Sequence, residues 1–374
     1  MYYVANARMP NEKAHGIQLA KQCEAFAAEG IDLILVLPRL KNKIKDSLEE
    51  YYSLDKRISV RKLPIINFGN SGFAFNLRSL SFSLVSFLYL LFKTRGKDAV
   101  IYTIDLDQFS FSPLPLLGVP VFFEAHGSKK KNRMLSFFLA RGHGVITNSR
   151  GVAAKFHDDF ALPNEKMITA PNGIDPKLFP SRFSKQEART ALGLPLDREI
   201  IVHTGQFYDW KGLGILAETA TIIPNRLFYL VGGEEEGFRK ATNVLDIPKN
   251  VICVGHKPLK EIPVWTAAAD VLLVLGTKTN SYSYMETSPM KIFEFLASGR
   301  LMVVSGTPAN REVVTEREVF FYEPDDASAL VQGIEQSLYG EDAWKKAAYG
   351  KEKAKEYTWA ARTGIILKFI SLHS

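Results

Sequence analysis

Short runs of branched apolar residues alternate along the chain with stretches in which apolar residues recur at helical spacing. The short runs favour buried strands, and the stretches between them favour helices with one apolar face. In the first half we expect strands at residues 2–5, 33–37, 99–103, 119–124 and 144–147, and helices at residues 16–29 and 79–93. Alternating strands and helices are typical of a parallel sheet that is covered by helices.

A cluster of turn residues, Pro-Asn-Gly-Ile-Asp-Pro at 171–176, interrupts this pattern. Proline and glycine break both helical and strand periodicity, so the cluster marks a domain boundary. The alternation then restarts, with expected strands at 199–203, 227–231, 251–254, 271–275 and 301–305 and expected helices at 212–222, 259–269, 289–298 and 327–339. A chain of 374 residues also exceeds the size at which a single core keeps growing.

The expected fold class is therefore α/β, with two Rossmann-like doubly wound domains that face each other across a cleft. Residues 1–173 would form the first domain, and residues 174–358 would form the second. Apolar positions in the tail, residues 359–374, favour a helix that packs back on the first domain.

The segment at residues 284–299 carries two acidic residues, Glu286 and Glu294, eight positions apart. Ser288 and Pro289 lie between them and match an N-cap followed by a first helical residue, because proline lacks the N–H group that this position leaves unpaired. We therefore expect a helix to begin between the two acids. An ordinary capped amphipathic helix is the alternative explanation of this segment.

The expected helix start has the properties of a phosphate-binding site. The backbone N–H groups of Met290 and Lys291 would be free at the positive end of the helix dipole, next to the N-cap Ser288. Glu286 would lie in the preceding loop and Glu294 about one and a half turns along the helix, so that their carboxylates are at most roughly 12 Å apart. This arrangement suits a ligand with hydroxyl groups at both ends and phosphates between them, such as a sugar nucleotide.

A second candidate phosphate contact follows the first expected strand of the second half. Gly205 would allow a ligand to approach the backbone closely. Lys211 would begin the next helix and could reach a phosphate as a point charge. A solvated surface lysine is the alternative, although a cation in a first helical turn opposes the helix dipole.

Two residues of the first half lie where ligands bind in open α/β sheets. His126 follows an expected strand, and Gly16 opens the first long helix. A hydrogen-bonded structural histidine is the alternative explanation for His126. The segment around Gly16 lacks the G-x-G-x-x-G fingerprint, which disfavours a nicotinamide-dependent enzyme. Asp105 and Asp107 match a metal-binding acid pair, but such spaced acids often arise by chance.

Taken together and in this order, several segments resemble glycosyltransferase family 4. They are Gly16 before the first helix, Glu-Ala-His at 124–126, Pro-Asn-Gly-Ile-Asp at 171–175, the segment 205–212, and Glu286 with seven residues before Glu294. The resemblance covers residues 1 to about 360. It implies the GT-B fold and a retaining enzyme that moves a sugar from a nucleotide-diphosphate sugar to an acceptor hydroxyl, in glycan, glycolipid or polysaccharide biosynthesis.

The resemblance also implies a role for each motif residue. Glu286 would hold the hydroxyls of the donor sugar, and Glu294 would hold the ribose. Lys211 would neutralise the leaving pyrophosphate, and His126 would contact the sugar from the facing domain. Gly16 would let the first loop approach the phosphates. On this basis the enzyme is a hexosyltransferase that needs no metal ion or cofactor, and its donor is a UDP-, GDP- or ADP-sugar.

One position departs from the family pattern. Gln206 stands where the family usually has arginine, five positions before Lys211. A neutral amide leaves one phosphate contact weaker, or supplied by a neighbouring basic residue. Gln206 thus favours one alternative, a non-catalytic protein that binds sugar nucleotides. A sugar-nucleotide epimerase, which shares the two facing Rossmann-like domains, is a second alternative.

Charge and cysteine content say little about the acceptor but narrow the location. The net charge of +7 is compatible with anionic substrates or an anionic membrane face, and we expect no nucleic-acid partner. A glycan, a lipid-linked sugar and a small molecule are all permitted acceptors. Cys23 and Cys253 are expected to be buried thiols of a reducing compartment, and the N-terminus shows no signal-peptide pattern. We therefore expect a cytoplasmic protein, with peripheral contact at the inner membrane face permitted.

The longest apolar stretch without charge is residues 79–92. At 14 residues it is shorter than the ~20 that a helix needs to span a bilayer. We therefore expect a buried helix there, and attachment to a membrane surface is the alternative.

Overall fold

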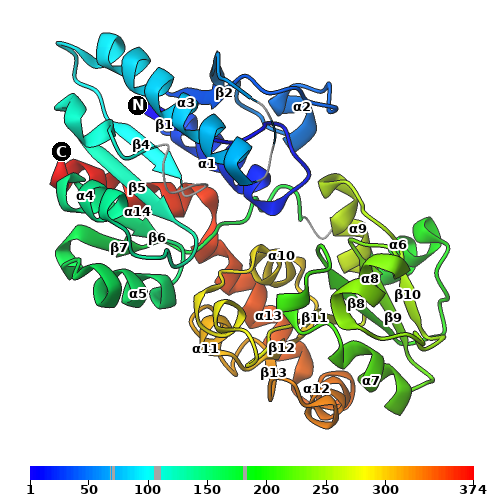
Figure 1. Ribbon diagram of the computed structural model, residues 1–374. Helices are drawn as coiled ribbons and strands as arrows, with labels where there is room; N and C mark the ends of the chain where they lie inside the picture. The colour runs from blue at the N-terminus through cyan, green and yellow to red at the C-terminus, as the bar shows by residue number, and fades with distance from the viewer. Residues whose placement is uncertain (68, 70–71, 105–110, 180–182) are drawn as a thin grey trace. The chain divides into compact units, whose positions relative to one another are not determined.

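The computed structural model describes residues 1–67, 69, 72–104, 111–179 and 183–374 (Figure 1). The chain forms two compact units. The first consists of Met1–Pro171 together with Trp359–Ser374, and the second consists of Asn172–Thr358. Asp105 and Asp107, the candidate acid pair, lie outside the described residues.

Within the described part of the first unit, seven parallel strands form a sheet in the order β3-β2-β1-β4-β5-β6-β7. The strands are β1 (Tyr2–Val4), β2 (Ile34–Pro38), β3 (Ser59–Leu63), β4 (Ile101–Ile104), β5 (Val121–Ala125), β6 (Gly144–Thr147) and β7 (Met167–Thr169). In the central register, Tyr3 pairs with Leu35 on one side and with Tyr102 on the other. The sequence pattern missed the two edge strands, because β3 is largely polar and exposed and β7 has only three half-buried residues.

Helices cover both faces of this sheet. The unit contains α1 (Ala14–Ala28), α2 (Leu48–Tyr52), α3 (Gly72–Thr94), α4 (Arg133–Arg141), α5 (Arg150–Phe160) and α14 (Trp359–His373), with short turns η1 (Leu114–Leu117) and η2 (Asn164–Lys166). One face packs against α1, α2 and α14, through residues such as Phe26, Leu48 and Phe369. The opposite face packs against α3, α4 and α5, through residues such as Phe82 and Phe156.

Helix α3 differs from the expectation for its apolar stretch. It has 23 residues, and in the described part of the chain it is the one helix long and apolar enough, by length and composition, to cross a membrane. Phe82 and Leu90 are buried in the core beneath it, whereas Leu84 and Leu88 are exposed. The prediction of a buried helix is therefore wrong for one of its two faces.

The second unit repeats the architecture. Its described residues form six parallel strands in the order β10-β9-β8-β11-β12-β13. They are β8 (Ile200–Thr204), β9 (Leu227–Val231), β10 (Val251–Cys253), β11 (Val271–Val274), β12 (Leu301–Ser305) and β13 (Phe320–Tyr322). The strand order reverses between β8 and β11, and ligands bind at such a switch point in open parallel sheets.

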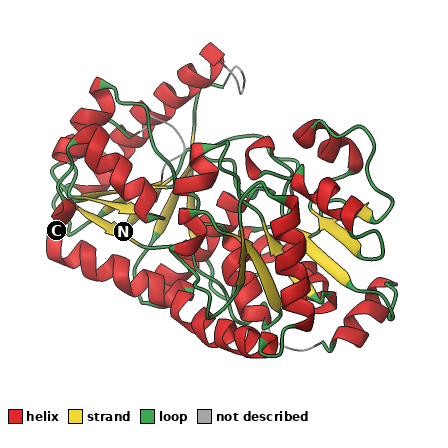
Figure 2. Cartoon of the chain, turned by 90° about the horizontal axis from the view of Figure 1, so that it is seen from below, coloured by secondary structure: helices red, strands yellow, loops and turns green. Residues whose placement is uncertain are grey.

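The helices of the second unit also form two layers. They are α6 (Lys185–Leu192), α7 (Ile215–Ile222), α8 (Glu235–Thr242), α9 (Ile262–Ala268), α10 (Met290–Ser298), α11 (Pro308–Arg311), α12 (Ala327–Tyr339) and α13 (Ala343–Lys353), with turns η3 (Asp209–Lys211), η4 (Leu259–Glu261), η5 (Tyr282–Glu286) and η6 (Ala354–Tyr357). Helices α6, α9 and α10 pack on one face, and α7, α8 and α12 pack on the other. Figure 2 shows strands lying between helices in each unit. The predicted α/β architecture with two parallel sheets is confirmed.

Candidate functional site

Two lysine side chains meet at one glycine at the switch point of the second unit. Gly205 directly follows β8, and its φ of +118° lies in the region that favours glycine. A Cβ atom on Gly205 would lie 3.4 Å from Nζ of Lys291 and 3.5 Å from Nζ of Lys211. The backbone and the two ammonium groups therefore surround the same small volume, which an anion would neutralise.

Lys211 does not begin a helix, as the sequence suggested. It ends the short turn η3, and α7 starts only at Ile215, so the argument from the helix dipole does not apply to it. Its Nζ donates to the backbone oxygen of Gln206 at 2.8 Å and lies 4.9 Å from the ring centre of Tyr208. Burial lowers the pKa of Lys211 to about 8, so it is charged at neutral pH but at a cost.

Lys291 is fixed in the first turn of α10 by a buried histidine. Its Nζ lies 3.2 Å from Nε2 of His203, and Nδ1 of the same ring lies 3.0 Å from the backbone oxygen of Leu273. Since the carbonyl can only accept, Nδ1 carries the proton and Nε2 accepts from Lys291. Burial and then the neighbouring charge of Lys211 lower the pKa of Lys291 well below its usual value.

Glu294 lies one turn further along the same helix and is half-buried. Burial raises the pKa of its carboxyl group to about 7, and the charge of Lys291 opposes that rise. A carboxyl group that titrates near neutrality can donate or accept a hydrogen bond. This property suits contact with a hydroxyl group of a ligand.

The start of α10 is held differently from the prediction. The helix begins at Met290 with Pro289 as its N-cap, so Ser288 is not the capping residue. Instead, the Ser288 hydroxyl accepts from the backbone N–H of Asn172 at 3.2 Å, and its carbonyl accepts from Nδ2 of Asn172 at 2.8 Å. Asn172 belongs to the turn cluster at 171–176, and this contact explains why an amide side chain stands there.

Glu286 closes the turn η5 immediately before this helix start. Its side chain is buried, with 2% of the residue exposed. The rings of Trp210 and Tyr282 pack edge to face with centroids 5.2 Å apart, so they join the loop that carries Lys211 to the turn that carries Glu286. Sequence reasoning missed this aromatic contact, because the two loops are about 70 residues apart.

His126 lies just past β5 in the first unit and is bound to a buried carboxylate. Its Nε2 lies 2.7 Å from Oε1 of Glu124. Glu124 also accepts from Arg362 of α14 at 2.6 Å and from the Tyr102 hydroxyl at 2.5 Å. Burial favours the neutral acid, but Arg362 and the two other partners outweigh it and hold the pKa of Glu124 at about 2.

Gly16 lies in the first turn of α1, two residues after the helix begins. A Cβ atom there would lie 2.4 Å from the Tyr52 hydroxyl and 2.7 Å from Oδ1 of Asn11. The glycine is therefore required for the packing of the first loop against α1. Burial, followed by the charges of Lys13 and His126, lowers the pKa of the adjacent His15 to about 4, so a neutral imidazole stands beside Gly16.

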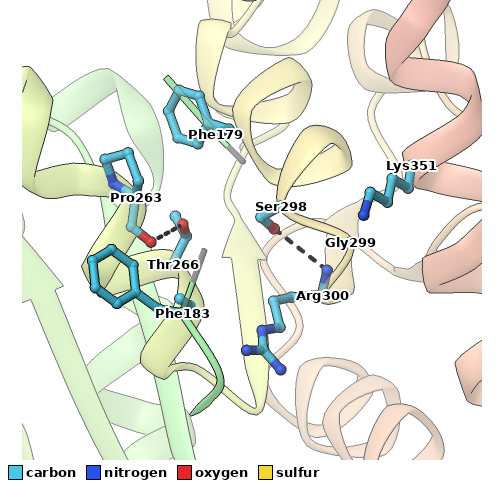
Figure 3. Close-up of a pocket in the computed structure, with 9 residues that line it drawn as sticks. Phe179, Phe183, Pro263, Thr266, Ser298, Gly299, Arg300 and Lys351 are labelled. Carbon is cyan, nitrogen blue, oxygen red and sulfur yellow. Dashed lines mark hydrogen bonds between the residues drawn. The ribbon is translucent and has the colours of Figure 1, made fainter. Parts of the chain in front are cut away.

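A separate cavity of about 220 Å³ lies at the other end of α10 (Figure 3). It is lined by Phe179, Phe183, Pro263, Thr266, Ala267, Ser298, Gly299, Arg300 and Lys351. None of the residues predicted from sequence is among them. Met290 and Lys291 lie at the opposite end of that helix, so the cavity is distinct from the lysine site.

Two family models match consecutive parts of the chain. Residues 16–178 match the family described as Glycosyltransferase Family 4. Residues 184–357 match the family described as Glycosyl transferases group 1. Each match covers most of one of the two sheets described above.

A curated relative and two solved structures resemble this chain. A Bacillus subtilis protein named as a teichuronic acid biosynthesis glycosyltransferase, TuaC, is 28% identical over 187 residues, which is 46% of this chain and 44% of that protein. The chain thus matches less than half the length of this relative. Sucrose-phosphate synthase from Thermosynechococcus elongatus has a TM-score of 0.76 at 19% identity, with full coverage of both chains. Anabaena HepE in complex with UDP-glucose has a TM-score of 0.75 at 17% identity, also with full coverage.

Proposed function

Because the chain belongs to glycosyltransferase family 4 and has the GT-B fold, we propose that it moves a sugar from a nucleotide-diphosphate sugar to an acceptor hydroxyl with retention of configuration. One observation carries the proposal: Lys211 and Lys291 flank Gly205 at the switch point of the second sheet. Two half-buried lysine side chains at the end of a parallel sheet suit a diphosphate, whose charge would favour their protonated forms.

The charge that develops during transfer is on the departing nucleoside diphosphate. Preorganised cations in a site of low polarity stabilise such a charge strongly. Lys211 and Lys291 supply two, and the backbone N–H groups at the start of α10, including that of Met290, add the positive end of the helix dipole. The leaving phosphate itself takes the proton of the acceptor hydroxyl, so no carboxylate acts as a covalent nucleophile.

Lys291 accounts for the departure at Gln206. The Gln206 amide oxygen accepts from the Tyr208 hydroxyl, and its backbone oxygen accepts from Lys211. Gln206 thus orients the loop, while the ammonium group that His203 holds in place provides the second positive charge. A neutral residue at position 206 is therefore compatible with turnover.

The remaining motif residues contact the two ends of the donor. Glu286 holds the hydroxyls of the sugar, and Glu294 holds the ribose, where a carboxyl group with a pKa of about 7 can share a proton with a hydroxyl. His126, held by Glu124, contacts the transferred sugar, and Gly16 allows the first loop to approach the phosphates. We favour uracil as the base of the donor, because the similar HepE structure holds UDP-glucose. We propose that the transferred sugar is a hexose.

We propose that transfer needs no metal ion, since Lys211, Lys291 and the start of α10 would offset the phosphate charge that magnesium offsets in other enzymes. Activity in excess chelator supports this view. Loss of activity in chelator, restored by added Mg²⁺ or Mn²⁺, would contradict it.

The acceptor is a hydroxyl of a glycan, a lipid-linked sugar or a small molecule. We place the enzyme in the cytoplasm, in peripheral contact with the inner membrane face. The relative named for teichuronic acid biosynthesis makes an anionic polysaccharide intermediate the first acceptor class to assay.

Release of nucleoside diphosphate from UDP-, GDP- and ADP-sugars in the presence of an acceptor panel tests the proposal. Lys211→Ala and Glu286→Ala should each lower transfer by on the order of 100-fold or more. Lys249→Ala removes an exposed lysine of the same unit and should leave the rate unchanged. Near-normal turnover in both site variants would overturn the assignment. Product formed without acceptor would indicate an epimerase, and donor binding without any product would indicate a non-catalytic protein.

A further inference from the structure

Helix α3 exposes a row of leucines, and most of the residues that it buries are polar. Its buried residues are Arg78, Ser79, Phe82, Ser83, Ser86, Leu90 and Thr94. On the opposite side, Leu80, Leu84, Leu88 and Leu91 are between 39% and 61% exposed. These four leucines, here called the leucine stripe, follow one another at intervals of four, four and three residues, which places them on one face of the helix.

A normal surface helix turns its one apolar stripe towards the core, whereas α3 packs Phe82 and Leu90 in the core and also carries the leucine stripe on its exposed side. Exposed single leucines need no explanation, but a contiguous apolar stripe marks a surface that something covers. The helix of 23 residues extends ~35 Å at the usual rise. Figure 1 shows α3 running along the outside of the first unit.

The helix is anchored in its unit and cannot turn this face inward. Phe82 and Leu90 have no exposed surface and pack with the sheet. The amide Nδ2 of Asn6, just after β1, donates to the Ser79 hydroxyl at 3.1 Å. A helix held in this way lies along a surface, because spanning a bilayer would remove these contacts.

Basic residues lie beside α3 and at its end, and they are here called the bordering cations. The guanidinium of Arg61 on β3 lies 5.7 Å from the ring centre of Tyr89 on α3. Lys93, Arg95 and Lys97 follow at the end of the helix and are exposed, with Asp98 as a neighbouring acid. The imbalance extends to the whole unit, whose sequence has 25 Lys and Arg against 15 Asp and Glu, whereas the second unit has 22 against 25.

We propose that the leucine stripe and its bordering cations form the surface by which the first unit docks onto a membrane that contains anionic lipids. The leucines enter the boundary between headgroups and acyl chains, and the cations bind the phosphate and carboxylate charges of the headgroups. This inference specifies the peripheral membrane contact included in the proposed function. It is tested without any transfer assay, so each can fail separately.

Co-sedimentation of the full chain with phosphatidylcholine vesicles, with and without phosphatidylglycerol, provides the test. The protein should bind the anionic vesicles, bind the neutral ones weakly, and dissociate as salt is added. Leu84→Glu combined with Leu88→Glu should weaken binding by about tenfold or more, since the buried apolar area is lost. Arg61→Glu combined with Lys93→Glu should also weaken binding, by removing headgroup contacts.

Leu245→Glu provides the matched control. Leu245 is 79% exposed in the second unit, so this variant makes the same type of substitution once, on an apolar surface position away from α3, and should bind vesicles like the unchanged protein. All substituted residues are exposed or at the surface, and circular dichroism melting curves check that each variant is folded. Absence of binding to anionic vesicles, or equal binding by the Leu84 and Leu88 variant, would overturn the proposal. A dimer in analytical ultracentrifugation that dissociates on the Leu84 and Leu88 substitutions would also overturn it, because a second copy would then cover the stripe.

Discussion

The ammonium group of Lys291 lies 3.2 Å from Nε2 of His203, a ring whose other nitrogen is committed to the backbone of β11. This contact fixes a flexible side chain beside Gly205 without giving it a negative partner. Burial and the two lysine charges lower the pKa of His203 well below its usual value, so the ring stays a neutral acceptor. The Lys291 side chain is thus preorganised, and in the proposed function a bound phosphate would favour its charged form.

If Lys291 replaces the family arginine, the two positions should compensate for each other. Lys291→Ala should lower transfer by on the order of 100-fold, as expected when one charge stabiliser is removed. Adding Gln206→Arg to that variant should restore at least part of the rate, whereas Gln206→Lys, without the forked guanidinium, should restore less. Steady-state kinetics of the three proteins check this, and Gln206→Arg alone is the control. No recovery in the double variant would count against a shared role.

Donor binding should weaken above pH 8. Lys211 has a pKa of about 8, so its charge is present below that pH and lost above it. The dissociation constant for UDP should therefore change little below pH 8 and rise by up to about tenfold per pH unit above it. Calorimetric titrations at several pH values measure this, and they should also detect proton uptake on binding near pH 8, because a bound diphosphate favours the charged lysine.

The Lys211→Arg variant is the control for this pH dependence. A guanidinium stays charged over the whole interval, so the variant should show a weaker dependence. The stability of the free protein should depend on pH in the opposite direction to donor binding. The unfolded chain holds the Lys211 proton up to its usual pKa of 10.5, so folded stability should rise as the pH increases from about 8 towards that value. Identical binding profiles for the two proteins would contradict the role given to Lys211.

The pair formed by Glu124 and Arg362 should be a major source of stability in the first unit. Glu124→Gln leaves the buried guanidinium without its charge partner and should lower the free energy of unfolding by about 3–5 kcal/mol. Arg362→Met should cost a similar amount, and the double variant should cost clearly less than their sum. Urea unfolding of the four proteins measures this coupling. Strictly additive losses would mean that the two charges do not depend on each other.

The same pair predicts a direction of acid sensitivity. The pKa of Glu124 is lowered from 4.5 to about 2. Its contribution to stability is therefore complete above pH 4.5 and is lost as the pH falls from 4.5 towards 2. Between pH 4.5 and 2, the free energy of unfolding should fall more steeply with decreasing pH in the unchanged protein than in Glu124→Gln. Urea unfolding at several pH values measures this.

Central strands could be predicted from sequence, whereas among the edge strands of the two described sheets only β10 was predicted. Strands such as β4 and β8 are buried on both faces, and so they read as continuous apolar runs. β3 and β13 lie at sheet edges, where β3 is polar and β13 has only three residues. A short or polar edge strand forms because it pairs with the adjacent strand of the sheet, and the local sequence pattern does not show that pairing.

The motif residues could be predicted from sequence, but the residues that hold them in place could not. Lys211, Glu286 and Glu294 stand at recognisable spacings after strands or near a helix start, and these spacings are visible in the chain. His203 and Asn172 act by fixing other residues across the fold, at 88 and 116 positions' separation. Their roles follow from tertiary contacts. The capping prediction for Ser288 was wrong, because the helix begins at Met290, and the Ser288 hydroxyl accepts instead from the backbone N–H of Asn172.

The return of α14 to the first unit has a consequence for biosynthesis. Arg362 reaches Glu124 from 238 positions further along the chain, and Ile366 and Phe369 fill the core over the first sheet. On the ribosome, the first unit therefore emerges early but lacks the counter-ion of its innermost carboxylate until the entire second unit has been made. The first unit, although it is synthesised first, can therefore complete its core only after the carboxyl-terminal helix has left the ribosome.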